Sequence, residues 1–378
     1  MSGYLRKSLL AVAGATIGAV SANATVTYGG GGTYAVSSPI NDNIDIIEGA
    51  HVALESGGSV TGVSETDFFL RGAANVRSGT LSANGNARID AGANQYALNI
   101  FGTTVRLQDQ ARVTGNVYSA YYPGAQLEMS GRSVIDGDLE YAGRIRMHDQ
   151  AAILGNINYN GDYELNMYGG AIAGTAHMHG INGGYAINMH GGAILGGVDA
   201  WNSYAVAMQM TGGYIGNGLL VEDWASIQGE IRGGQIDGGI TIDTNGFSPT
   251  SHLILSGGQF NANAADYLLT FSDANTWSDS PYSTLEIWGG QFGYAGSGLG
   301  LYIDNLVNFD IHGRDLVYTE GWLTGYLLDG SWFSNALTFG DTWRGTFTIH
   351  NVPEPATTTL FLTAVLGVVA FRRRSRAS

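Results

Sequence analysis

A short motif, apolar-x-apolar followed by a glycine or aspartate turn, recurs through most of this chain and restricts the folds open to it. Nine successive copies are VRLQDQARVTGNV, LEMSGRSVIDGDL, IRMHDQAAILGNI, LNMYGGAIAG, INMHGGAILGGV, MQMTGGYIGNGL, GEIRGGQIDGGI, LILSGGQF and LEIWGGQF. Their second apolar positions are separated by 22, 18, 20, 22, 21, 21, 24 and 32 residues. Repetition at this spacing predicts a stack of similar units, each burying its apolar side against its neighbours.

The pattern within each copy predicts β-structure. Apolar residues alternate with period two, whereas an amphipathic helix needs a period of 3.6. The chain also has 58 glycines, and each glycine inside a helix costs about 1 kcal/mol relative to alanine. The frame of leucine-rich repeats and the G-X-Y period of collagen are both absent. The remaining architecture is a parallel β-helix, in which like positions stack on the next turn at ~4.8 Å.

Stacking of like positions predicts the core and the corners of this β-helix. Methionine fills irregular gaps well, so a column of methionines indicates packing and not a ligand site. Paired glycines suit corners, where left-handed backbone is favourable only for glycine. The two expected inward columns are Leu127, Ile145, Leu165, Ile187, Met208 and Met129, Met147, Met167, Met189, Met210. The expected corner pairs are Gly169–Gly170, Gly191–Gly192, Gly212–Gly213 and Gly233–Gly234.

The body divides into a repetitive part and a closing part. We expect residues 25–313 to form a right-handed parallel β-helix, about 60 Å long at the usual strand spacing. Residues 314–350 are rich in tryptophan and phenylalanine and lose the glycine-pair phase. Because the last turn of a solenoid exposes unpaired strand edges, we expect residues 314–350 to close it with antiparallel strands.

Charge and cysteine content exclude several functions. The chain has 32 acidic and 17 basic residues, and six of the basic residues lie near the two ends. Such an acidic body repels phosphates, so we expect no nucleic-acid partner. The absence of cysteine excludes disulfides, thiolate chemistry and cysteine-ligated zinc.

The first 24 residues have the three parts of a secretory signal peptide. Arg6 and Lys7 provide the positive region, and an apolar stretch follows from residue 9 to residue 20. Small residues then occupy the cleavage positions, Ala22 and Ala24. We therefore predict a signal peptide over residues 1–24, cleavage after Ala24 and export by the Sec machinery.

The C-terminal end has the composition of a short membrane segment. Residues 357–371 are uncharged, and a cluster of arginines follows: Arg372, Arg373, Arg374 and Arg376. A helix of this length spans about 22 Å, shorter than the ~30 Å hydrocarbon core. Arginines favour the cytoplasmic side, so we expect a transient inner-membrane helix with the body outside and the arginines inside as a stop signal.

This tail resembles the PEP-CTERM protein-sorting signal. The resemblance rests on Pro353, Glu354 and Pro355, the apolar run and the arginine cluster, within residues 351–378. It implies export by a Gram-negative bacterium and recognition by an exosortase, with Pro-Glu-Pro as the processing motif. The resemblance also implies that the final location is the cell surface or an exopolysaccharide matrix. Two prolines also keep the segment extended, as a protease subsite requires.

The sequence gives only weak evidence for a set of catalytic residues. A glycoside hydrolase needs two carboxylates about 5–10 Å apart, and stacked turns offer Asp136, Asp138 and Glu140 on one strand-turn and the pair Glu222 and Asp223 in a loop. The signatures of pectin-type hydrolases are absent. We expect no catalytic residues and no cofactor, and keep a polysaccharide lyase or glycoside hydrolase as the first alternative.

Two groups of histidines raise the question of a metal site. His148 and His190 continue a column through Tyr168, which alternation directs outward. His177 and His179 share one strand face, and two imidazoles there need a third ligand to form a metal site. No third ligand is evident nearby in sequence, so we interpret both groups as surface polar ladders and predict no metal.

Aromatic residues suggest contact with carbohydrate, because flat rings are enriched at binding faces. The candidates are Tyr118, Tyr121, Tyr122, Tyr159, Tyr168, Trp201 and Trp288. The resulting interpretation is an exported, non-catalytic structural or carbohydrate-contacting β-helix, with an adhesin as the second alternative.

Overall fold

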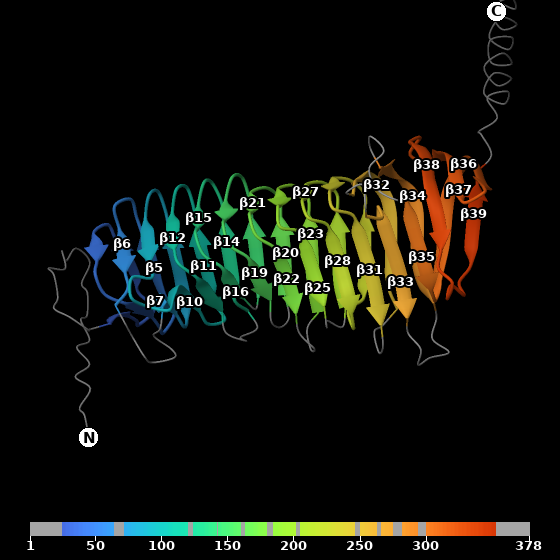
Figure 1. The fold of residues 1–378 in the computed structure, drawn as a ribbon. Helices are drawn as coiled ribbons and strands as arrows, with labels where there is room; N and C mark the ends of the chain where they lie inside the picture. The colour runs from blue at the N-terminus through green and yellow to red at the C-terminus, as the bar shows by residue number, and fades with distance from the viewer. Residues whose placement is uncertain are drawn as a thin grey trace, which may run out of the picture.

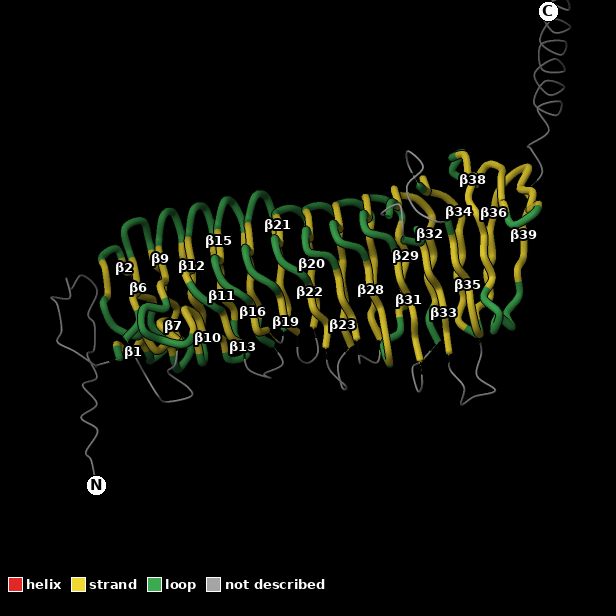
Figure 2. The backbone as a smooth tube through the Cα atoms, viewed as in Figure 1, coloured by secondary structure: helices red, strands yellow, loops and turns green. Residues whose placement is uncertain are grey.

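The computed structural model describes residues 25–63, 72–119, 124–141, 143–159, 163–179, 184–201, 205–245, 250–262, 266–274, 282–293 and 300–352. These segments form one elongated parallel β-solenoid, with β1 and β39 at opposite ends (Figures 1 and 2). The parallel β-solenoid predicted from the repeat is therefore confirmed, whereas its right-handedness stays a prediction.

Each turn contributes up to three strands, and each strand pairs in parallel with its equivalent on the next turn (Figure 2). The first strands of the turns are β1 (Val26–Tyr28), β4 (Ile44–Ile46), β7 (Gly72–Val76), β10 (Tyr96–Ile100), β13 (Val117–Ser119), β16 (Leu139–Tyr141), β19 (Ile157–Tyr159), β22 (Ala176–His179), β25 (Val198–Trp201), β28 (Leu219–Asp223), β31 (Ile240–Asn245), β33 (Leu269–Ala274) and β35 (Leu301–Asn305). The second strands are β2 (Thr33–Val36), β5 (Ala50–Leu54), β8 (Gly79–Ala83), β11 (Thr104–Leu107), β14 (Gln126–Met129), β17 (Arg144–Met147), β20 (Tyr163–Met167), β23 (Gly184–Met189), β26 (Ala205–Met210) and β29 (Ile227–Ile231). The third strands are β3 (Pro39–Ile40), β6 (Ser59–Thr61), β9 (Arg88–Asp90), β12 (Arg112–Thr114), β15 (Val134–Ile135), β18 (Ala152–Ile153), β21 (Ala171–Ile172), β24 (Ala193–Ile194), β27 (Tyr214–Ile215) and β30 (Gln235–Ile236).

The last turns have longer strands and a different closure. The strands β32 (His252–Phe260) and β34 (Ser283–Phe292) continue from the second position into the third, and β36 (Val307–Thr319) follows them. The final strands are β37 (Trp322–Leu327), β38 (Trp332–Phe339) and β39 (Phe347–Asn351).

The core consists of the predicted columns. Met129, Met147, Met167, Met189 and Met210 are fully buried and pair in consecutive register from β14 to β26. The column that begins at Leu127 has the same register and burial. The longer spacings do not break the stack, because Leu255 still pairs with Ile287. Like positions therefore superpose along these two columns, and the β32–β34 pair shifts register only after Leu255.

The corner glycines are required for two different reasons. Gly192, the second member of its pair, has a φ of 80°, in the left-handed region. A Cβ added at Gly191, the first member, would lie 2.9 Å from the Tyr168 carbonyl oxygen of the preceding turn. The first glycine thus permits close stacking of turns, and the second permits the corner.

The C-terminal closure is mixed and begins before the predicted boundary at residue 314. The strand β36 crosses that boundary and pairs antiparallel with β37, which pairs antiparallel with β38. In contrast, β39 pairs parallel with β36, and the Phe309 and Phe347 rings stack 5.3 Å apart. The strand β38 also pairs parallel with β35 along its other edge. The expectation of wholly antiparallel strands over 314–350 is therefore wrong for β38 and β39, because their apolar residues continue the solenoid stack.

The predicted terminal helices lie outside the described residues. The first of these segments is residues 1–24 with the cleavage positions Ala22 and Ala24. The second is residues 357–371 with the arginine cluster that follows them. Within the described ranges, the structure contains no helix with the length and apolar character needed to cross a bilayer.

Candidate functional site

One outward row of polar residues runs along the second strands, and we call it the polar ladder. Alternation within each strand directs these residues outward, because their neighbours on both sides are buried in the core, except for the half-buried Gly229 beside Glu230. Register pairs each member with the next. The polar ladder consists of Arg106, Glu128, Arg146, Asn166, Asn188, Gln209 and Glu230.

Members of the polar ladder interact from turn to turn. The Arg106 Nε lies 2.7 Å from the Glu128 Oε2, and the Asn188 amide donates to the Asn166 Oδ1 at 3.0 Å. Gln209 is exposed. Asn166 itself is buried. The ladder therefore offers hydrogen-bonding groups at its other turns, where successive members are spaced by the strand separation of ~4.8 Å.

A row of rings, here the ring ladder, borders the polar ladder and consists of His148, Tyr168 and His190. The Tyr168 ring lies 4.7 Å from the His148 ring and 5.0 Å from the His190 ring, with interplanar angles of 7° and 12°. The His190 Nδ1 lies 3.0 Å from the Thr211 hydroxyl. The predicted outward column is confirmed, and it presents ring edges and polar tips because the faces of Tyr168 are covered by imidazoles.

The other predicted aromatic candidates do not form one surface. Tyr159 is only 2 % exposed and belongs to the core, so its prediction as an outward residue is wrong. Tyr118 lies beside Tyr96, with ring centroids 5.0 Å apart. Trp201 and Trp288 are 42 % and 39 % exposed, on first and second strands respectively. Tyr121 and Tyr122 lie outside the described residues.

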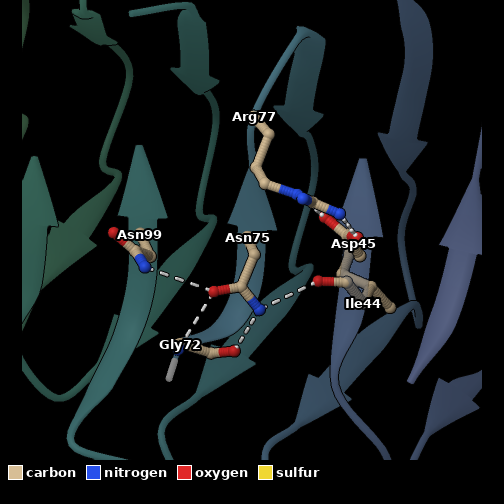
Figure 3. A network of polar contacts seen from close by, with 6 residues as sticks. All are labelled: Ile44, Asp45, Gly72, Asn75, Arg77 and Asn99. Carbon is tan, nitrogen blue, oxygen red and sulfur yellow. Dashed lines mark hydrogen bonds and ion pairs between the residues drawn. The ribbon is translucent and has the colours of Figure 1, made fainter. Parts of the chain in front are cut away.

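A buried polar cluster near the N-terminal end has a structural role (Figure 3). The Asn75 Oδ1 accepts from the Gly72 N–H at 3.0 Å and from the Asn99 amide at 3.4 Å, while its Nδ2 donates to backbone carbonyls of β4 and β7. Arg77 forms an ion pair with the buried Asp45 of the preceding turn. Because buried polar groups need such partners, the cluster is best understood as a link between turns.

The carboxylates considered for catalysis have separate partners. Asp136 pairs with Arg112 at 2.6 Å, Asp138 accepts from the Asn156 N–H at 2.7 Å, and Glu140 accepts from the Tyr96 hydroxyl at 3.0 Å. Each partner lies on an adjacent or more distant turn. These three carboxylates therefore have the contacts of residues that join turns.

Glu222 lies in a more acidic environment. Its partial burial and then the negative charges of Asp199, Asp223 and Asp243 raise the pKa of the Glu222 carboxyl above its usual value. Asp243 is the register partner of Glu222 on β31. This part of the first-strand face consequently carries a local excess of negative charge.

The histidines of β22 have a carboxylate beside them. The Asp199 Oδ2 lies 3.0 Å from the His177 Nδ1 and 3.7 Å from the His179 Nε2. Burial, together with the neighbouring His177, lowers the pKa of the His179 imidazole below its usual value, although the adjacent Asp199 acts in the opposite direction. Asp199 was missed from the sequence because it follows His177 by one full turn; the signal was the repeat register.

Fold and surface together define an extended β-solenoid with a repeating polar face. Comparison with protein families adds the C-terminal motif: residues 351–374 match the family described as the PEP-CTERM protein-sorting motif. The matched segment contains Pro353, Glu354 and Pro355 and ends within the arginine cluster. No curated protein and no solved structure matches the chain. The motif implies a protein that is exported by a Gram-negative bacterium, processed at the membrane and recognised by an exosortase.

Proposed function

We propose that this protein is a non-catalytic component of the cell surface or exopolysaccharide matrix, and that its polar ladder and ring ladder contact polysaccharide. The observation that carries the proposal is the repetition of outward polar side chains from turn to turn, as in the register pair of Asn188 and the exposed Gln209. An extended polysaccharide also repeats its hydroxyl groups. Several weak contacts made together give an avidity that one contact lacks.

Delivery is consistent with this role. The sorting motif supports processing by an exosortase after export, with Pro353, Glu354 and Pro355 as its recognition element. On this proposal, a transient inner-membrane helix over residues 357–371 precedes release to the surface or matrix. The solenoid is then a rigid rod, and the register of its strands fixes the positions of the side chains that contact the ligand.

Co-sedimentation of the full chain with exopolysaccharide from the producing bacterium tests the contact face. We expect Asn188→Ala to weaken binding by roughly two- to tenfold, because a hydrogen bond contributes about 0.5–1.5 kcal/mol and 1.4 kcal/mol corresponds to a factor of ten. The matched control is Asn158→Ala, an exposed asparagine on the first-strand face, which should bind like the unmodified chain.

Three outcomes would contradict the proposal. The first is absence of co-sedimentation, and the second is equal loss in both asparagine variants. The third is the appearance of new reducing ends or unsaturated ends in the polysaccharide, which would favour the glycoside hydrolase or lyase alternative.

A further inference from the structure

The first-strand face carries two histidines that neither ladder includes. In β22, His177 and His179 lie on either side of the buried Met178 and therefore project from the same face. Asp199 in β25 is the register partner of His177. The fold thus brings together residues that are 20 or more positions apart in sequence.

The separations of these groups match those of a metal centre. The ligand atoms of the three residues all lie within 4.8 Å of one another, and two of the separations are 3.0 and 3.7 Å. A tetrahedral ion with bonds of about 2.0–2.2 Å holds its ligand atoms about 3.4 Å apart. Small side-chain adjustments therefore suffice to form all three bonds.

One of these atoms makes no hydrogen bond. The His179 Nε2 is buried and accepts or donates no hydrogen bond among the described residues. Leaving a buried polar atom in this state is unfavourable. A cation placed between the two rings and the carboxylate satisfies it.

The surroundings orient the rings and attract a cation. The Trp201 ring lies 4.4 Å from the His179 ring and restricts its movement. Glu222 and Asp243 follow Trp201 in register on the next two turns and add negative charge. All three proposed ligands are only partly exposed, which leaves one side of the cluster open to solvent.

We propose that His177, His179 and Asp199 bind a divalent first-row transition-metal ion, with Zn²⁺ as the preferred probe, and leave one coordination position open. Two imidazoles and one carboxylate suit such ions better than Ca²⁺ or Mg²⁺, which prefer all-oxygen sites. The site joins two consecutive turns and is separate from the polysaccharide-contacting face proposed above.

Calorimetric titration of the full chain with Zn²⁺ tests the site, using protein purified in detergent with a histidine-free tag and stripped by a chelator. We expect one Zn²⁺ per chain. The variants His179→Gln and Asp199→Asn should each weaken binding by at least about tenfold, because loss of even an outer-shell partner costs 10–100-fold. Cobalt gives an independent readout, since its visible absorption reports ligand number and should change in both variants.

Matched controls separate this site from the other histidines. His190→Gln alters the ring ladder, and His350→Gln alters a histidine that lies 3.5 Å from Asp310; both should bind Zn²⁺ like the unmodified chain. Circular dichroism would establish that each variant is folded. Absence of Zn²⁺ binding, equal binding by the His179 and Asp199 variants, or loss of binding only in His350→Gln would overturn the proposal.

Discussion

Position within the turn, more than residue type, decides what each side chain does. Met167 is fully buried, while Tyr168, the next residue, is 50 % exposed. Tyrosine itself appears in both environments, since Tyr159 and Tyr185 belong to the core. The alternation of strand side chains fixes the direction of each residue once its register is known.

Truncating one methionine of the central column should destabilise the solenoid. We expect Met167→Ala to lower the free energy of unfolding by about 2–5 kcal/mol, because it leaves a cavity between Met147 and Met189. Met167→Leu, which conserves volume, should cost less than about 1.5 kcal/mol. Urea denaturation measures both, and an alanine variant as stable as the leucine variant would contradict the stacked column.

At the scale of strands and corners, the sequence predicted the stack well and the side-chain partners poorly. The glycine or aspartate turns and the alternating apolar residues were sufficient to align Met129 with Met210, because both signals are local and repeat each turn. Asp199 and the burial of Tyr159 were not predicted, since both depend on which residues face each other across turns. The parallel pairing of β39 was missed because its sequence lacks the glycine-pair signal.

A corner glycine that has both a positive φ and a close backbone neighbour should tolerate substitution less well than a corner glycine that has a positive φ alone. We expect Gly192→Ala to destabilise the protein by more than Gly49→Ala. Both glycines have positive φ, which costs an alanine roughly 1–2 kcal/mol. A Cβ at Gly192 would in addition lie 2.7 Å from the Gly169 carbonyl oxygen, whereas one at Gly49 would meet nothing within 4 Å.

Thermal unfolding of the two glycine variants gives this comparison directly. A lower midpoint for Gly192→Ala than for Gly49→Ala is the expected order. Equal midpoints would mean that the turns at this corner are not as closely stacked as the structure indicates.

At the scale of the whole molecule, the chain combines a rigid body with a C-terminal sorting motif. The body needs no disulfide, because each turn is hydrogen-bonded to its neighbours over much of its length. The motif at residues 351–374 begins at Asn351, the last residue of β39. The last strand of the solenoid thus leads directly into the sorting motif.

Removing the Pro-Glu-Pro motif should block processing without affecting the body. We expect a variant with alanine at 353, 354 and 355 to keep its C-terminal arginines and to remain in the inner-membrane fraction. The unmodified chain should lose them. Fractionation with mass spectrometry of the mature C-terminus measures both, and an equally processed variant would argue against exosortase recognition through this motif.

The register of the turns is the basis of the core, the polar ladder and the proposed metal site, and paired cysteines test it most directly. The chain has no cysteine of its own. Asn166 and Asn188 are register partners on neighbouring turns, at a strand spacing of ~4.8 Å that suits a disulfide. Gln209 lies one turn further along and too far from Asn166.

Oxidation of the double-cysteine variants, followed by mass spectrometry of the linked peptides, gives the measurement. We expect an intramolecular disulfide for cysteines at 166 and 188, and none for cysteines at 166 and 209. Efficient linkage of the second pair, or failure of the first pair in a folded protein, would contradict the stacked solenoid.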